Sequence, residues 1–90
     1  MITIHKYSLN TDQTQKVEMP RGAQLLSVQA QDEKVMVWAR VDTIYTNVQR
    51  IFHVALTGSD ISSRLMGKHI GTVLLSGGGF VVHVFDGGEE

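Results

Sequence analysis

The sequence predicts an all-β fold: a small antiparallel β-sandwich or barrel of about seven strands. Three observations support this class. β-branched and aromatic residues are abundant, and these side chains favour strands. Apolar residues recur at every second position in segments spaced by roughly ten residues. The apolar spacing of a helix persists nowhere, so we expect at most one short helical turn, near residues 60–66.

The first four strands are expected in the N-terminal half of the chain. Residues 2–9 are apolar at even positions first and at odd positions afterwards, so we expect a bulge near Lys6. A second strand leads to Pro20, whose missing amide hydrogen ends the strand or restricts it to a sheet edge. Strands over 26–31 and 35–41 flank a short polar loop and predict a hairpin.

The C-terminal half predicts three more strands and their connections. These strands cover residues 51–56, 70–75 and 80–85. A polar loop over 42–47 precedes them. Ser59 or Asp60 is suited to begin a helical turn, and Gly67 is suited to end it. The run Ser76–Gly79 supplies residues that tolerate positive φ, so the last two strands are expected to form a second hairpin.

Composition limits the domain count and the partners. The 90 residues are expected to form a single β domain over 1–86, with a frayed acidic tail at 87–90 that has nothing to bury. The net charge of −1 lacks the basic excess of a nucleic-acid-binding protein. No apolar run reaches the ~18 residues needed to span a membrane, and there is no cysteine for a disulfide. We therefore expect a domain of the cytoplasm that binds neither nucleic acid nor membrane.

Several short strings along most of the chain carry a family resemblance. They are Val17-Glu18-Met19-Pro20, Leu26-Ser27-Val28-Gln29, Val37-Trp38-Ala39, His69-Ile70-Gly71-Thr72-Val73 and Val82-His83-Val84-Phe85. In order and spacing the chain resembles a family of short uncharacterised proteins encoded by tailed phages and prophages. The strings are strand residues and turn glycines, so the resemblance implies no catalytic or binding residue. It implies a place of action, the cytoplasm of an infected or lysogenic bacterium.

The sequence contains no pattern typical of catalysis or metal binding. Its histidines are spread over four segments, and none has a second ligand at the spacing that a strand requires. Ser76, His83 and Asp86 are the residue types of a hydrolase triad, but the sequence lacks the strained turn that presents a nucleophilic serine. We expect no enzyme activity, no metal and no cofactor.

Two weaker patterns suggest binding sites. In Ser76-Gly77-Gly78-Gly79, consecutive backbone amides can point into one concavity and hold a phosphate, with Arg21 and Arg50 as candidate partners. The lysine and the helix of a nucleotide phosphate loop are missing, which favours a plain hairpin tip. Residues 35–41 and 80–85 are apolar on both faces, which indicates an outer cover.

The outer cover of these two strands concerns four side chains. They are Met36, Trp38, Val81 and Phe85. A tryptophan in such a strand is typical of the core, so we expect Trp38 to be buried. The cover is expected to be a loop of the chain, a second copy in a homo-oligomer, or a host protein.

These observations leave three function classes open. The favoured hypothesis is a non-enzymatic binding protein of phage type that occludes a host protein of antiviral defence. The alternative is an oligomeric sponge that sequesters an anionic nucleotide signal with the glycine loop and arginines. A role in the virion or its assembly is the third hypothesis.

Overall fold

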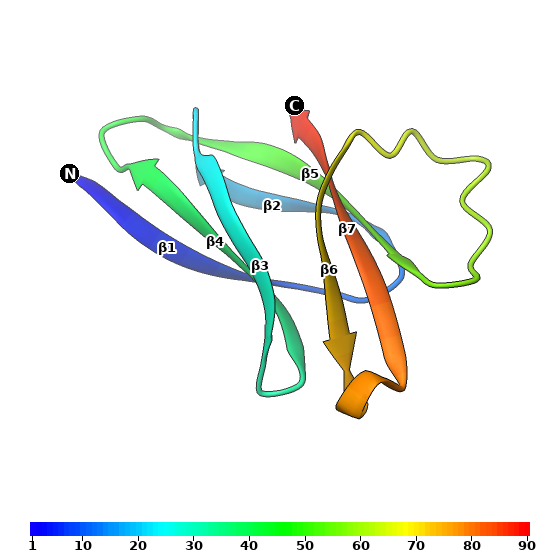
Figure 1. Ribbon diagram of the computed structural model, residues 1–90. Coiled ribbons are helices and arrows are strands. Elements are labelled where there is room, and N and C mark those ends of the chain that lie inside the picture. The colour runs from blue at the N-terminus through cyan, green and yellow to red at the C-terminus, as the bar shows by residue number, and fades with distance from the viewer.

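Seven antiparallel strands in two sheets form an open sandwich (Figure 1). The computed structural model describes all 90 residues. The strands are β1 (Ile2–Leu9), β2 (Thr14–Pro20), β3 (Gln24–Gln31), β4 (Lys34–Asp42), β5 (Asn47–Leu56), β6 (Lys68–Leu75) and β7 (Phe80–Glu89), with a 3-10 turn η1 (Ser76–Gly78). Sheet A has the order β1-β4-β3 and sheet B the order β2-β5-β7-β6. This confirms the predicted all-β class as a sandwich; the barrel is not closed.

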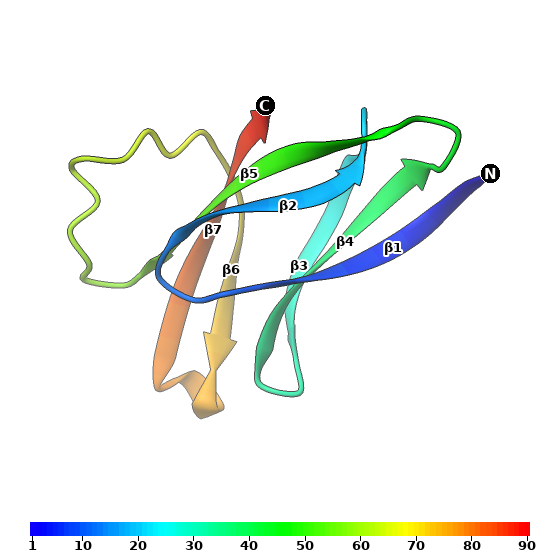
Figure 2. The same cartoon turned by 180° about the vertical axis from the view of Figure 1, so that it is seen from behind.

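The two sheets approach each other most closely along one side. There β3 lies beside β6, in front in Figure 1. On the other side, turned to the viewer in Figure 2, β1 and β2 are the free outer strands of sheets A and B. The Cα atoms extend only 15 Å in the thinnest direction, which fits two sheets about 10 Å apart.

Alternation along the central strands builds the core between the sheets. In β4 the odd-numbered residues Val35, Val37 and Val41 are buried, and in β7 the even-numbered Val82 and Val84 are buried. Because successive side chains of a strand point to opposite faces, the remaining residues of β4 and β7 face outward. The core is therefore one layer of apolar side chains, mostly valine, shared by both sheets.

Trp38 is not in this core, contrary to our expectation. Its neighbours Val37 and Ala39 are both fully buried, so Trp38 points to the outer face of sheet A, where it is half-buried. Both parities of β4 are apolar, and the sequence alone did not show which one faces sheet B.

The bulge expected near Lys6 is also absent. β1 pairs with β4 in one unbroken register from Ile2 opposite Asp42 to Leu9 opposite Val35. Leu9 is buried, so the even-numbered residues of β1 face outward and its isoleucines are exposed. The prediction was wrong because it assumed that every apolar residue of this strand reaches the core.

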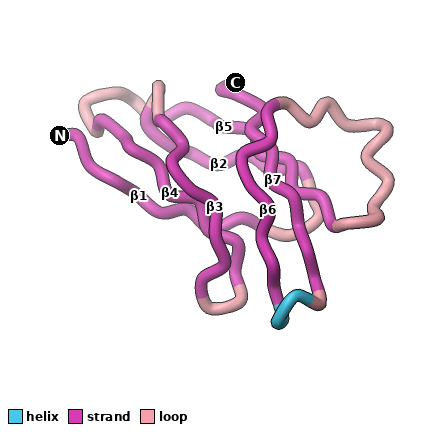
Figure 3. Tube along the Cα trace, in the orientation of Figure 1, coloured by secondary structure: helices cyan, strands magenta, loops and turns pink.

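The connections are short except for the loop after β5 (Figure 3). This loop contains no helix; the Arg64 amide donates to Ile61 in an isolated turn, and the Asp60 carboxylate accepts from the Ser62 amide. The single helical turn of the chain is η1, between β6 and β7. The hairpins predicted for β3–β4 and β6–β7 are confirmed.

The acidic tail that we expected to fray belongs to β7. The strand continues to Glu89, which lies opposite Arg50 in β5, and the Glu90 amide donates to the Gln49 carbonyl. The Glu89 carboxylate also accepts from the Gly22 amide at 2.6 Å. Backbone pairing and carboxylate contacts order this tail although it buries little apolar surface.

Candidate functional site

The glycine-rich loop predicted to bind an anion is the tip of the β6–β7 hairpin. Ser76, Gly77 and Gly78 have positive φ. The Ser76 amide and hydroxyl donate to the same carboxylate oxygen of Glu33, at 2.7 and 3.3 Å. A carboxylate of the chain itself therefore takes the donors nearest the start of this loop.

The two arginines predicted to join the loop lie at the other end of the sandwich. Arg21 follows β2, and Arg50 lies near the start of β5; in Figure 1 these segments are at the top and η1 is at the bottom. Arg50 makes a two-pronged contact with Asp86, at 2.9 and 2.6 Å, and donates to the Ala23 carbonyl at 2.9 Å. Within one chain the predicted site of Ser76–Gly79 with Arg21 and Arg50 is not assembled.

The Arg50–Asp86 pair is a structural clamp. Hydrogen bonds from Arg50 hold the pKa of Asp86 below its usual range, and Asp86 raises the pKa of Arg50. Both side chains are mostly buried, with 12% and 17% of their surfaces exposed. The clamp joins β5 to β7 and, through Ala23, to the chain between β2 and β3.

The four residues predicted to form an interface lie on two different surfaces. Met36 and Trp38 project from the outer face of sheet A, whereas Val81 and Phe85 project from the outer face of sheet B. All four are half-buried. They cannot form one apolar patch, so the idea of a single outer face built from both strands is corrected.

Polar groups cover much of the outer face of sheet B. The His83 ring makes hydrogen bonds with the hydroxyls of Thr57 and Thr72, at 2.7 and 3.1 Å. His69 contacts the edge of the Phe85 ring, with 5.2 Å between the centroids. This face therefore combines satisfied polar side chains with one large exposed apolar residue, Leu74, which is 59% exposed.

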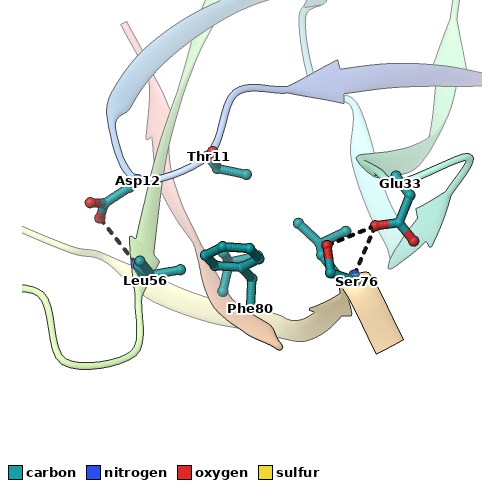
Figure 4. Close-up of a pocket in the computed structure, with 8 residues that line it drawn as sticks. Thr11, Asp12, Glu33, Leu56, Ser76 and Phe80 are labelled. Carbon is teal, nitrogen blue, oxygen red and sulfur yellow. Dashed lines mark hydrogen bonds between the residues drawn. The ribbon is translucent and has the colours of Figure 1, made fainter. Parts of the chain in front are cut away.

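A cavity of about 380 Å³ opens at the lower end of the sandwich, between the sheets (Figure 4). Leu56, Leu75, Phe80 and Val82 give it an apolar lining. Phe80 is 54% exposed. The cavity can accept a small apolar group.

Two carboxylates at this end hold loops together. Asp12 accepts from the Leu56 amide at 3.1 Å and from the Ser59 hydroxyl at 3.2 Å. These hydrogen bonds, with the nearby Arg64, lower the pKa of Asp12. Glu33 has a φ of 62° in the two-residue turn of the β3–β4 hairpin, and its carboxylate binds the next hairpin. Both acids serve the fold, since they bind backbone amides.

The outer face of sheet A is different from that of sheet B. Its large apolar side chains are Ile2, Ile4, Leu26, Met36 and Trp38, and together with Arg40 we name them the sheet A face. Ile2 and Ile4 are 56% and 58% exposed. Arg40 lies opposite Ile4 in the register and has no ion-pair partner. An unpaired guanidinium therefore stands within an exposed apolar surface.

Arg40 also borders two shallow hollows. One, of about 430 Å³, is lined by Ile2, Thr3, Ile4 and Arg40. The other, of about 510 Å³, includes Arg21, Arg40 and Tyr45, with the Arg21 guanidinium 5.3 Å from the centre of the Tyr45 ring. Asp42 lines the second hollow as well, and its carboxylate accepts from the Ile44 amide. Two arginines without ion pairs thus flank the end of the sheet A face.

The free edge of β1 completes this surface. The Thr43 amide donates to the Met1 carbonyl at 2.9 Å, which shows that the odd-numbered residues of β1 are the ones that bond to β4. In an antiparallel pair only alternate residues exchange hydrogen bonds with the partner strand. The backbone groups of the even-numbered residues Ile2, Ile4, Lys6 and Ser8 consequently point away from β4. No other strand pairs with this edge.

Residues 1–90, the whole chain, match the family model of a domain of unknown function, DUF7352. The chain belongs to the DUF7352 family. The predicted membership of an uncharacterised family is confirmed, and the phage context stays a prediction. No curated protein and no solved structure matches this DUF7352 chain.

The DUF7352 structure offers little for other kinds of site. No three histidine, aspartate or glutamate side chains lie close enough together to hold a metal ion. None of its helices has the length and apolarity required to cross a membrane. Ser76, His83 and Asp86 each bind other residues of the chain.

Sequence reasoning missed Ile2, Ile4 and Arg40 as surface residues of one site. The signal was present in β1, because Ile2 and Ile4 have the opposite parity to Tyr7 and Leu9. With one continuous register, only one of these pairs can face the core. The structure assigns the core to Tyr7 and Leu9.

Proposed function

We propose that this DUF7352 domain is a non-enzymatic binding protein that covers the surface of another protein with its sheet A face. The observation that carries this proposal is the exposure of Ile2 and Ile4 beside Trp38 and the unpaired Arg40. Exposed apolar patches on small domains mark interaction sites. Tryptophan and arginine are the residues that most often dominate binding energy in protein interfaces.

The proposed partner is a host protein, a component of antiviral defence in the cytoplasm of an infected or lysogenic bacterium. The resemblance to phage proteins supports this choice of partner. Occlusion acts by one-to-one binding and needs no catalytic group. The charge of Arg40 favours a partner surface that places a carboxylate within an apolar patch.

A comparison of the two outer faces tests the proposal. The immobilised wild-type domain is exposed to host lysate, and the retained protein is identified, purified and titrated against the domain. We expect Arg40→Glu and Trp38→Ser to weaken binding roughly 10-fold or more, as for dominant interface residues. The matched substitution Phe85→Ser on sheet B should leave binding within about 2-fold. The activity of the purified host protein should fall in proportion to bound domain and reach its minimum at equal molar amounts.

Two results would contradict this function. In one, Phe85→Ser reduces binding as much as the sheet A variants, which would move the interface to sheet B. In the other, the retained protein keeps its full activity when saturated with the domain, which would exclude occlusion. Circular dichroism of each variant shows whether its fold is retained.

One observation favours the nucleotide sponge as a second candidate function. Arg21 over the Tyr45 ring and Arg40 line the same hollow, so a phosphate and a base could both find contacts there. In this candidate function the hollow is the anion site in place of the glycine loop, because the Glu33 carboxylate already binds the first amide of that loop. A bound nucleotide at a hundredfold excess over its Kd stabilises the fold by about 2.7 kcal/mol and raises Tm by several degrees. A thermal-shift panel of mono-, di- and cyclic nucleotides, with Arg21→Gln as the control, decides between the candidates.

A further inference from the structure

The free edge of β1 is a row of hydrogen-bonding groups that no other strand of the molecule pairs with. Ile2, Ile4, Lys6 and Ser8 direct their amides and carbonyls away from β4, and no residue of the chain pairs with this edge. A long apolar edge strand is a ready template for another strand. The side chains of the same residues continue the sheet A face to its border.

The edge strand is complementary to itself in one register. Two copies related by a two-fold axis run antiparallel, and the free-edge residues of each copy must pair with those of the other. If the axis passes beside His5, then Ile2 pairs with Ser8 and Ile4 with Lys6 of the second copy. This register uses all four free-edge residues; a shift of the axis by one residue uses fewer.

Charge supports the same register. Lys6 is the only formally charged residue of β1, and its ammonium group donates to Gln31 at 2.7 Å within its own chain. With the axis at His5, each Lys6 lies opposite an isoleucine. Moving the axis to Lys6 would place two ammonium groups directly opposite each other, which is destabilising.

We infer that two copies of this chain pair through β1 in an antiparallel, two-fold arrangement centred on His5. Sheet A of each copy then becomes half of one continuous sheet. This inference builds on the proposed function, because the dimer places two sheet A faces side by side on one surface. The pairing itself depends on backbone groups of β1, whereas the proposed binding depends on side chains of both β1 and β4.

A disulfide experiment measures the register directly. The chain has no cysteine, so an introduced thiol reports without background. In the inferred dimer the two His5 residues face each other as a non-hydrogen-bonded pair, about 4.5 Å apart at Cα, which is within disulfide reach. His5→Cys should therefore cross-link rapidly under mild oxidation. Thr3→Cys is the matched control, since the two Thr3 residues are about 13 Å apart along the strands and should remain reduced.

Proline substitutions test the backbone contacts. Ile4→Pro removes a free-edge amide and should give a folded monomer. Lys16→Pro removes the equivalent free-edge amide of β2 and should leave the dimer intact. Sedimentation equilibrium of the wild type at about 0.2 mM should give a mass near twice the 10.0 kDa of one chain.

Each outcome supports the inference or overturns it. A wild-type mass of 10.0 kDa at this concentration, or equal cross-linking of Thr3→Cys and His5→Cys, overturns it. A dimer that persists in Ile4→Pro also overturns it. Loss of the dimer together with retained host-protein binding leaves the proposed function standing, and loss of host binding in Arg40→Glu with an intact dimer rejects only the proposed function.

Discussion

The two free edge strands, β1 and β2, differ in how they are protected. β2 carries Lys16 and Glu18 on its outward face and ends at Pro20, which has no amide hydrogen. The Val54 amide donates to the Gln13 carbonyl, so the odd-numbered residues of β2 exchange hydrogen bonds with β5. The backbone groups of Lys16, Glu18 and Pro20 therefore point to the free edge. Charged residues and proline are the usual means of blocking an edge.

β1 has no comparable protection. Its free-edge positions hold two exposed isoleucines, a lysine and a serine. β2 is further held by an ion pair between Lys16 and Glu90 at 2.8 Å, whereas no side chain of β1 takes part in an ion pair. The difference indicates that this sandwich avoids pairing at one edge and permits it at the other.

The largest expected effect concerns the strands beside each edge. Phe52 in β5 is fully buried, whereas Trp38 in β4 lies on the outer face. Phe52→Ala should lower the free energy of unfolding by about 3–5 kcal/mol, and Trp38→Ala by about 1–2 kcal/mol, because less of its surface leaves water on folding. Urea denaturation gives both values. Equal losses would mean that Trp38 belongs to the core after all.

A smaller effect is expected at the clamp of Arg50 and Asp86, which joins β5, the neighbour of β2, to β7. Asp86→Asn should cost about 1–3 kcal/mol at neutral pH, because Arg50 loses a charged acceptor. The pKa of Asp86 is lowered in the folded state, so its contribution is complete above its unfolded value of about 3.9 and is lost as pH falls through the folded value.

Thermal denaturation tests this linkage when it is measured from about pH 6, where Asp86 is ionised, down to about pH 2, where it becomes protonated. The wild type and Asp86→Asn should differ most at the upper end of this range and converge at its lower end. A difference that stays constant with pH would show that the charge of Asp86 contributes nothing to stability.

The smallest effect is expected from removing the protection of β2. Lys16→Val combined with Glu18→Val gives β2 an apolar free edge like that of β1, so the variant should form species larger than a dimer. Lys16→Gln with Glu18→Gln is the control, since it removes the charges and keeps the edge polar. Light scattering on both variants compares the outcomes; a valine variant no larger than the wild type would show that Lys16 and Glu18 do not protect this edge.

Much of the sandwich follows from local pattern. The alternation of β2 and the turn residues between hairpin strands predict these elements because both depend on neighbours in sequence. Pro20 was expected at a strand end or sheet edge, and it has both positions. Local pattern fails where two parities are apolar, as in β4, since the facing sheet decides which one is buried.

The candidate site was harder to predict than the fold. Glu33 and Ser76 are separated by 43 residues, and no spacing in the sequence predicts the hydrogen bond between them. The ordered tail depends on backbone pairing with β5, which leaves no trace in hydrophobicity. Arg40 became a site residue only when the register of β1 and β4 placed it beside exposed isoleucines.

The strand order has a consequence for how the domain folds. The chain crosses from sheet A to sheet B after β1, returns after β2, and crosses again after β4. β2 pairs only with β5, so this edge of sheet B can form only after two intervening strands have been passed. Such distant pairings make folding slow, on the order of milliseconds to seconds, because loop closure precedes the contacts that stabilise it. Neither sheet is a contiguous stretch of chain, and the two are therefore expected to form and melt together in a single cooperative transition.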